Sequence, residues 1–494
     1  MREPGLRDSQ FGRTVSAFSL GLVIFVGTVA GWATLPKGST DTGVITVLWL
    51  NVLIALTALA IESSRRPYSL HLMHLLCMFL FMGAAALYQY TSGMFGTAGH
   101  IDTVKDQILP AALTFTLWFI GYLAGYEIHH HIFAPLRSGA VARFLKRPLT
   151  SARVNLSLIF ALIVLGYLAL LGLAGVGTRN ASRAALEEHT LLQGGALSQA
   201  FFLVHMWILR AFPMVALVSG MLLFGRDQRS RSPLLLFLIL ALAVGNLAAN
   251  NPFAAPRMWF ATTVLAFSSP FILRRLRTGW AIVLIAITGL TLLPSLNWSR
   301  YAATVSELMS YFALVSPTDY LARSADVDSL GMTALCVKWI ESHGHRWGLQ
   351  IVGALFSWFP RAFWPSKPIG TGKMVTEDLG FEFTNLSPSI PAEALVDFGP
   401  LGVPIFAALV GILFSRLDWT YWARDREANG ARVTVIDCIY PFWIGCVIYI
   451  TRGDMFGAFT MTAGFTVCIL PLTLGMSRAT RQSARATAKA KAPT

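Results

Sequence analysis

Long apolar runs alternate with short polar connections along most of this chain. Most runs are close to the ~20 residues that a helix needs to cross a bilayer, and the pattern predicts about twelve spanning helices. We place them at residues 15–35, 43–61, 71–90, 110–127, 154–176, 199–224, 233–250, 257–273, 279–294, 399–416, 434–450 and 455–475. The expected fold class is therefore an all-α polytopic membrane protein.

Composition supports a membrane protein rather than a soluble one. Of the 494 residues, 55% are hydrophobic and 13% are charged, whereas a soluble domain carries roughly 25% charged residues. The formal net charge is +14. In a membrane protein such an excess sets orientation, so no nucleic-acid partner is expected. The five cysteines have no spacing that indicates a disulfide framework or a zinc site.

Basic residues indicate how the helices are oriented. With a cytoplasmic N-terminus, the basic connections "ESSRRP", "GRDQRSRS" and "RRLR" all fall on the cytoplasmic side. Both termini are then cytoplasmic. The first apolar run has the pattern of a signal anchor rather than of a cleaved signal peptide. The tail, residues 477–494, has the composition of a disordered cytoplasmic extension that contacts anionic lipid headgroups.

The connection between the ninth and tenth predicted helices is much longer than the others and lies outside the cytoplasm. Its apolar stretches are too short to span a bilayer and predict short interfacial helices. The position of this long loop argues against a transporter built from two equal halves. The chain thus divides into a first transmembrane bundle, an extracytoplasmic loop, a second group of spanning helices and a tail, at 1–294, 295–398, 399–476 and 477–494.

Cations lie at the predicted outer side or within the membrane. The stretch "FPRAFWPSKPIG" holds Arg361 and Lys367 between prolines that exclude a regular helix. Arg210 lies within the sixth helix, where a charge costs several kcal/mol unless it is paired or faces water. Arg257 begins the eighth helix, and Arg452 lies in the turn between the last two helices. Such cations suit phosphate. Membrane anchoring or internal ion pairing are the alternative roles.

Carboxylates gather in the stretch "NLSPSIPAEALVDFGPLGVP", residues 385–404. Glu393 and Asp397 are spaced i and i+4 and share a helix face. A carboxylate beneath a cationic cap is a candidate general base. Alternatively, an acid at this place complements the dipole of a helix N-terminus, and this reading applies most to Asp397. Asp319, in "SPTDYL", is a lesser candidate base, and Ser387 lies in a turn before the helix.

Other side chains contribute less to the prediction. Trp364, held between prolines, is the aromatic best placed to support a sugar ring. Lys373 follows an incomplete phosphate-loop pattern, so nucleotide binding is rejected. The histidines at 129–131 lie on the cytoplasmic side, and Glu341, His343 and His345 lack a further ligand. Neither group predicts a metal site.

Several of these residues together resemble a known family. The chain is similar to the bacterial O-antigen and exopolysaccharide repeat-unit polymerases, the Wzy-like membrane glycosyltransferases. The resemblance lies in the helix number, in the late extracytoplasmic loop and in one motif region. The motif residues are Pro360, Arg361, Trp364, Lys367, Pro368, Glu393, Phe398, Gly399 and Gly402. O-antigen ligases share the general plan.

The resemblance implies a GT-C-like glycosyltransferase of the bacterial inner membrane that needs no metal and no cofactor. Its donor and acceptor are polyprenyl-pyrophosphate-linked oligosaccharides, and membrane lipids, a chain-length regulator and a flippase are its further expected partners. Glu393 is the expected base, with Arg361 and Lys367 as catalytic cations. The expected substrate-binding residues are Arg210, Arg257, Asp319, Trp364, Ser387 and Arg452.

Two alternatives stay open. A ligase would use the same donor and transfer the glycan to another lipid or to a protein. A transporter or flippase for lipid-linked oligosaccharides would need an aqueous path lined by charges in both halves of the membrane. The sequence places most ionisable residues at the outer side, which favours an enzyme over a transporter.

Overall fold

The computed structural model describes residues 41–63, 66–133, 139–170, 204–249, 257–276, 280–289, 306, 310, 316–359, 361, 363–384, 386–427 and 432–473. Its α-helices are α2 (Thr42–Ser63), α3 (Leu70–Cys77), α4 (Ala85–Ser92), α5 (Ile108–Ile128), α6 (Ala140–Leu145), α7 (Ser151–Leu170), α10 (Ala211–Arg226), α11 (Pro233–Ala249), α12 (Arg257–Phe271), α15 (Pro317–Arg323), α16 (Ser329–His343), α17 (Leu349–Leu355), α18 (Thr371–Asp378), α19 (Ile390–Glu427), α20 (Val435–Arg452), α21 (Met455–Val467) and α22 (Leu470–Thr473).

Short elements complete the fold. The π-helical segment η1 (Met78–Ala84) joins α3 to α4, so these three elements form one continuous rod. A two-stranded antiparallel hairpin follows, with β1 (Met94–Phe95) paired to β2 (Gly99–His100). The π-helical segment η4 (His129–Phe133) extends α5, and the π-helical segment η5 (Val204–Leu209) precedes α10. Short 3-10 turns lie at Ile101–Thr103, Lys105–Gln107, Gln228–Ser230 and Leu273–Arg275.

Eight helical segments in the described ranges are long and apolar enough to cross a membrane. They confirm the expected class, a polytopic helical membrane protein. They begin and end within a few residues of the predictions at 43–61, 71–90, 110–127 and 434–450. Two more apolar segments, Pro233–Leu247 and Trp280–Gly289, are shorter. The helix predicted at 15–35 lies outside the described residues.

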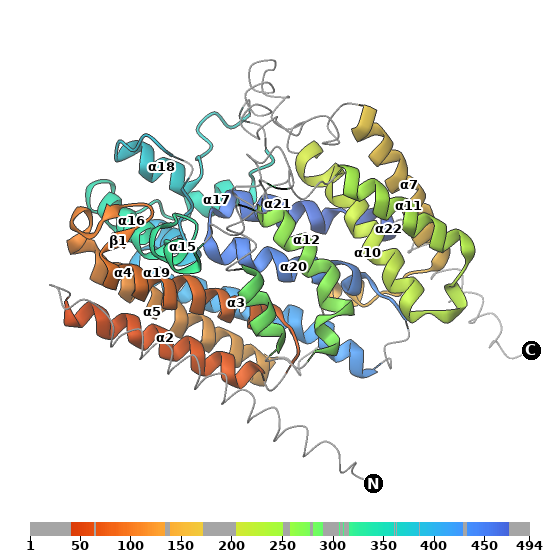
Figure 1. Ribbon diagram of the computed structural model, residues 1–494, viewed down its shortest axis with the longest axis horizontal. Coiled ribbons are helices and arrows are strands. Elements are labelled where there is room, and N and C mark those ends of the chain that lie inside the picture. The colour runs from red at the N-terminus through yellow and green to blue at the C-terminus, as the bar shows by residue number, and fades with distance from the viewer. Residues whose placement is uncertain are drawn as a thin grey trace, which may run out of the picture.

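Helices group at two ends of the molecule around a central set (Figure 1). One group contains α2, α3, α4 and α5, and the other contains α7, α10 and α11. Between them, α20 packs against α12 and α21, and α19 lies along α5. The short helices α15–α18 come from the predicted 295–398 loop, and α16 packs on α5 and α19 rather than standing apart from the bundle.

Small residues allow α5 and α19 to approach closely. Gly121 and Gly125 form a G-x-x-x-G pair on α5, a spacing that brings membrane helices together. A Cβ added at Gly121 would lie 2.3 Å from the carbonyl oxygen of Pro404, and one at Gly125 would lie 2.2 Å from that of Ala408. The backbones of the two helices are therefore in direct contact, which fixes the position of α19 and of the residues it carries.

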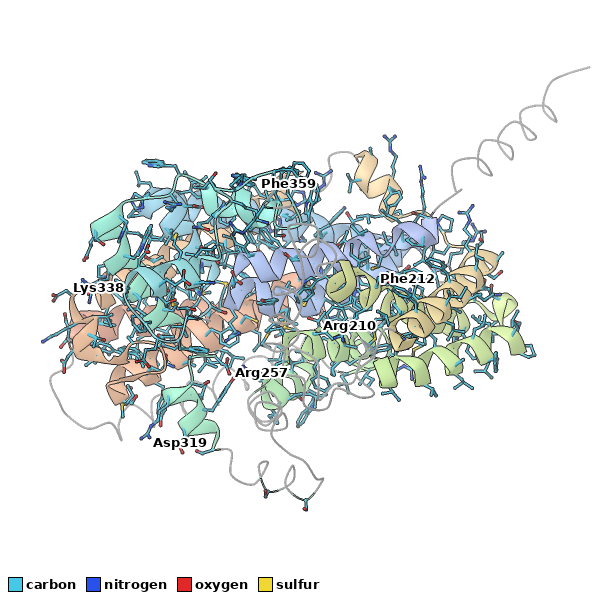
Figure 2. All side chains as sticks on the ribbon, turned by 90° about the horizontal axis from the view of Figure 1, so that it is seen from above. Arg210, Phe212, Arg257, Asp319, Lys338 and Phe359 are labelled. Carbon is cyan, nitrogen blue, oxygen red and sulfur yellow. The ribbon has the colours of Figure 1, made fainter. Side chains whose placement is uncertain are left out.

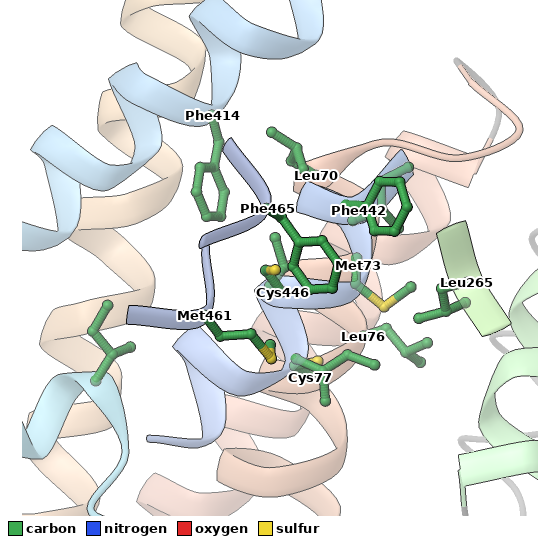
Figure 3. Close-up of a cluster of buried hydrophobic side chains, with 14 of the residues drawn as sticks. Leu70, Met73, Leu76, Cys77, Leu265, Phe414, Phe442, Cys446, Met461 and Phe465 are labelled. Atoms are coloured by element: carbon green, nitrogen blue, oxygen red, sulfur yellow. The ribbon is translucent and has the colours of Figure 1, made fainter. Parts of the chain in front are cut away.

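The core between the helix groups is apolar and tightly packed. Figure 3 shows buried side chains from α3, α12, α19, α20 and α21 in one cluster. Phe442 and Phe465 stack with ring centroids 4.7 Å apart. This cluster holds α20 against α21 and therefore fixes the turn between them.

The tenth predicted helix begins at Ile390 rather than at residue 399. Pro391, in its first turn, needs no amide partner there and favours a helix start. Gly399 has φ 70°, a conformation that kinks the helix. The sequence "FGPLG" therefore marks a kink and not the helix start. As a consequence, Glu393 and Asp397 lie on a short helical segment that precedes the kink, and not in a loop.

Candidate functional site

Two of the five predicted cations bind one carboxylate. Arg257 begins α12, Arg452 ends α20, and both donate to Asp326 in the turn between α15 and α16. Arg257 Nη2 lies 2.9 Å from Asp326 Oδ1, and its Nη1 bonds Oδ2. Arg452 Nη2 lies 2.8 Å from Oδ1, and its Nε donates to the main-chain oxygen of Asp326. The Tyr320 hydroxyl donates to Oδ2 at 3.3 Å. We call these four residues the Asp326 cluster.

Glu393, the predicted base, lies in the first turn of α19 and is fully buried. Its Oε2 accepts a hydrogen bond of 2.6 Å from the Thr371 hydroxyl, and its Oε1 accepts one of 2.8 Å from the amide of Met455. The carboxylate of Asp454, the residue before Met455, interacts electrostatically with Glu393. The turn Arg452–Met455, here the α20–α21 turn, therefore contacts both Glu393 and the Asp326 cluster.

The α20–α21 turn also packs against the stretch that precedes α19. Gly453 has φ 120°, and a Cβ there would lie 1.4 Å from the carbonyl oxygen of Pro388, so only glycine fits. The same oxygen accepts the Asp454 amide at 3.3 Å. Ser387, predicted to bind substrate, is the residue before Pro388 and is half-buried. The structure therefore brings the Ser387 and Glu393 region beside Arg452.

Asp397 supports a helix rather than an open site. Its carboxylate accepts the amides of Gln350 at 3.1 Å and Ile351 at 2.8 Å, at the N-terminus of α17. The acid thus complements a helix dipole, as one of the two sequence interpretations holds. The helix concerned is α17 and not the one that carries Asp397.

Arg361 and Lys367 bond to their own loop. Arg361 donates to the carbonyl oxygens of Lys367 and Pro368, the second at 3.1 Å. Lys367 is 6% exposed, and its Nζ donates to the carbonyls of Ser357 at 3.0 Å and Phe359 at 2.8 Å. Burial, and then the charge of Arg361, lowers the pKa of Lys367. Both cations fold the 357–368 segment, and Trp364 lies half-buried within it.

The remaining two predicted site residues lie apart in the view of Figure 2. Arg210 and Arg257 are near the middle of the molecule, whereas Asp319 is at its edge. Arg210 is the residue before α10 and is half-buried. Asp319 is exposed in the first turn of α15.

The rejected metal candidates make other contacts. His131 pairs with Glu127 at 3.0 Å, Glu341 accepts from Gln107 at 3.1 Å, and His343 stacks on Trp339. In the described ranges, no group of three or more His, Cys, Asp or Glu side chains is arranged to hold a metal ion.

Sequence reasoning missed Asp326, Tyr320, Thr371 and Asp454. Asp454 lies two residues after Arg452 in the turn between the last two helices, and that proximity was a usable signal. Asp326 and Thr371 carry no such signal. Asp326 is more than sixty residues from its partner Arg257, and Thr371 is more than twenty residues from its partner Glu393. These contacts exist only once the helices have packed.

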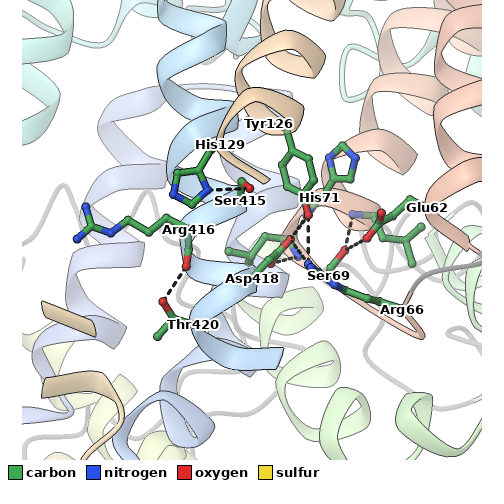
Figure 4. Close-up of polar contacts among 12 residues, drawn as sticks. Glu62, Arg66, Ser69, His71, Tyr126, His129, Ser415, Arg416, Asp418 and Thr420 are labelled. Atoms are coloured by element: carbon green, nitrogen blue, oxygen red, sulfur yellow. Dashed lines mark hydrogen bonds and ion pairs between the residues drawn. The ribbon is translucent and has the colours of Figure 1, made fainter. Parts of the chain in front are cut away.

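A second buried polar group lies toward the other end of α20. Asp418 accepts a hydrogen bond from the Tyr126 hydroxyl at 3.1 Å and pairs with Arg66 at 3.6 Å (Figure 4). The Tyr440 hydroxyl donates a further hydrogen bond to Asp418 at 2.6 Å. It also accepts the first two amides of α3, at 3.0 and 3.2 Å. We call Arg66, Tyr126, Asp418 and Tyr440 the Asp418 cluster. On α20, Tyr440 and Arg452 are roughly 18 Å apart at 1.5 Å per residue.

A cavity of about 420 Å³ opens beside α2 and α5, next to the Asp418 cluster. Aliphatic side chains of α2 line most of it, and Glu62, His71 and Glu127 supply its polar part. The residues predicted from the sequence to be catalytic or substrate-binding do not line this cavity. Of these residues, Arg452 lies in the α20–α21 turn, Glu393 contacts this turn, and Arg257 is joined to Arg452 through Asp326.

No protein-family model matches this chain, and no solved structure matches it. The class of the protein therefore rests on its own helices. Their length and hydropathy define a multi-pass α-helical membrane protein.

Proposed function

We propose that this protein is a polysaccharide polymerase that joins polyprenyl-pyrophosphate-linked repeat units at the outer face of the bacterial inner membrane. One observation carries the proposal. The α20–α21 turn contacts a buried carboxylate, Glu393, and contains Arg452, which shares the Asp326 carboxylate with Arg257. An acid for proton transfer beside cations for an oxyanion is the pairing that glycosyl transfer from a pyrophosphate donor needs.

The proposed reaction is a displacement at the anomeric carbon of the donor glycan. The acceptor sugar hydroxyl attacks this carbon, and the bond from the carbon to the pyrophosphate oxygen breaks. The hydroxyl proton passes to Glu393, which acts as the general base. The leaving polyprenyl pyrophosphate takes the electron pair, and Arg257 and Arg452 stabilise its charge.

Glu393 has no exposed surface, so its access to an acceptor needs explanation. Its bonds to Thr371 and Met455 use two of the roughly four acceptor positions of a carboxylate. Asp454, its electrostatic neighbour, is half-buried. We therefore place the acceptor hydroxyl on the Asp454 side, where Glu393 takes its proton.

The 357–368 segment completes the proposed site. Arg361 uses two of its five N–H groups within the loop and keeps others for the donor phosphate. Lys367 holds the segment in shape, and Trp364 offers a ring face to a sugar. Arg210, Asp319 and Ser387 remain proposed substrate contacts. The proposed mechanism uses no metal or cofactor, and a chain-length regulator and a flippase are its expected partners.

The test is polymer length. In a strain that lacks this gene, long chains should be lost while single repeats persist. Purified protein in lipid nanodiscs should convert lipid-linked repeats into longer glycans and release polyprenyl pyrophosphate. Normal long chains in the deletion strain would contradict the proposal. Accumulation of unattached full-length polymer would instead identify a ligase.

A transporter of lipid-linked oligosaccharides is the second candidate, favoured by one observation. Arg66, Glu62 and Asp418 bury charge in the half of the bundle that we predict to be cytoplasmic, so ionisable groups lie in both halves. The polymerase is preferred because Asp418 is fully engaged as a cap of α3 and a partner of Arg66. Movement of lipid-linked sugar across proteoliposomes without chain growth would reverse this preference.

A further inference from the structure

We propose that Asp326 is an internal competitor for the pyrophosphate, occupying the oxyanion site that Arg257, Arg452 and Tyr320 form. The carboxylate must leave this site before the diphosphate of a lipid-linked substrate can enter. The identity of that substrate rests on the function proposed above, whereas the anion site rests on the contacts of the Asp326 cluster.

The donors around Asp326 form a fork that fits a phosphate as well as a carboxylate. Arg257 presents two nitrogens to the two carboxylate oxygens, and Arg452 adds a third from another helix. Bidentate arginine geometry is shared by carboxylate and phosphate ligands. Burial raises the pKa of Tyr320, so its hydroxyl stays protonated and remains a donor. Four donors from three elements thus converge on one anion position.

Charge favours exchange of the carboxylate for a phosphate. Two guanidinium groups surround a single carboxylate, which leaves one positive charge of the cluster unbalanced within the cluster. A ligand with two negative charges would balance both arginines. The side chains of Arg257, Asp326 and Arg452 are 19%, 16% and 13% exposed, so the site is partly open to a ligand.

Asp326 lies in a segment that can release it without unfolding. It belongs to the turn between α15 and α16 rather than to a helix. Two residues on, Asp328 is bonded to the Thr97 amide at 2.8 Å and to the Gly331 amide at 2.7 Å. These bonds hold the turn to the β1–β2 hairpin and to the start of α16. Asp328 therefore holds the start of α16 in place when Asp326 is substituted or moves.

Binding of inorganic pyrophosphate to the purified protein in nanodiscs tests the proposal. Calorimetry should show at least tenfold tighter binding in Asp326→Asn than in the wild type, because the competitor has lost its charge. Asp102→Asn, at an exposed carboxylate of the same predicted face, should bind as the wild type does. Adding Arg452→Ala to Asp326→Asn should abolish the gain. Equal affinity of the folded Asp326→Asn protein and the wild type would overturn the proposal.

A second measurement uses the wild-type chain and does not depend on the stability of a variant. The amides of Asp326 and Val327 bond to Ser324 within the turn. Saturating pyrophosphate should speed hydrogen exchange at these amides several-fold as the turn releases Asp326. Unchanged or slower exchange would contradict displacement.

These tests separate the two proposals. Pyrophosphate binding that tightens in Asp326→Asn, with no glycan lengthening by the wild type, would support the competitor and refute the polymerase. Polymerisation by the wild type, with no tighter pyrophosphate binding in Asp326→Asn, would support the polymerase and refute the competitor.

Discussion

Asp418→Ala is expected to destabilise the fold more than any exposed substitution. The change removes an acceptor from two tyrosine hydroxyls, from the first two amides of α3 and from Arg66. All of these groups are buried, and Arg66 is 8% exposed. The Arg66 charge would lose its ion pair with Asp418 at 3.6 Å and keep the buried Glu62 as an acidic neighbour.

The size of the stability loss follows mainly from the buried ion pair between Arg66 and Asp418. Removing one member of a buried ion pair costs about 3–5 kcal/mol, because the other charge stays desolvated. Each buried donor left without a partner adds about 1–3 kcal/mol, although hydroxyls recover part of this by rotating. Ser69 still caps α3 by accepting the Leu72 amide at 2.9 Å, so the helix start is weakened and not lost. We expect a loss of at least about 4 kcal/mol from these terms.

Unfolding of purified protein in nanodiscs, followed by heating and size-exclusion chromatography, measures this loss. Asp102→Asn is the control and should unfold with the wild type. The double variant Arg66→Met with Asp418→Leu should be more stable than Asp418→Ala, since it removes the Arg66 charge together with its Asp418 partner. If Asp418→Ala unfolds like the control, or if the double variant is the least stable of the set, the reasoning is refuted.

Three further outcomes are expected. Glu393→Gln keeps the size of the side chain but cannot take a proton. The variant should insert normally, and its polymerisation rate should fall by about 100-fold or more, as expected for loss of a general base. A wild-type rate would remove Glu393 from the site. Arg361→Ala should likewise abolish chain growth, with Lys373→Ala, at an exposed lysine paired with Glu377, as the active control. Gly125→Leu should cost about 1–3 kcal/mol or more by overpacking the α5–α19 contact, whereas Gly166→Leu, which meets open space, should unfold like the wild type.

Sequence patterns predicted the spanning helices well because each depends on a local run of apolar residues. The start of α19 was misplaced, because the stretch "FGPLG" resembles a helix start whereas Gly399 has the backbone conformation of a kink within the helix. The interaction partners of the charged residues could not be predicted from the sequence. Nothing near Arg257 in the sequence indicates Asp326, and nothing near Asp397 indicates the N-terminus of α17. Such pairings are set by packing between distant helices, and the apolar pattern specifies the helices but not their neighbours.

The cations of the motif also show why loss of activity alone assigns no role. Arg361 donates to two carbonyls of its own loop, and Lys367 donates to two others, so either truncation releases the 357–368 segment as well as a charge. Glu393→Gln is different, because a glutamine oxygen still accepts the Thr371 hydroxyl or the Met455 amide. Arg361→Lys discriminates between the two roles. It keeps the charge and loses the planar fork, so a loop whose two carbonyl bonds need the fork geometry is weakened while a site that needs only a cation survives. Retained substrate affinity with retained activity in this variant would make Arg361 an electrostatic residue, and loss of both would make it a positioning residue.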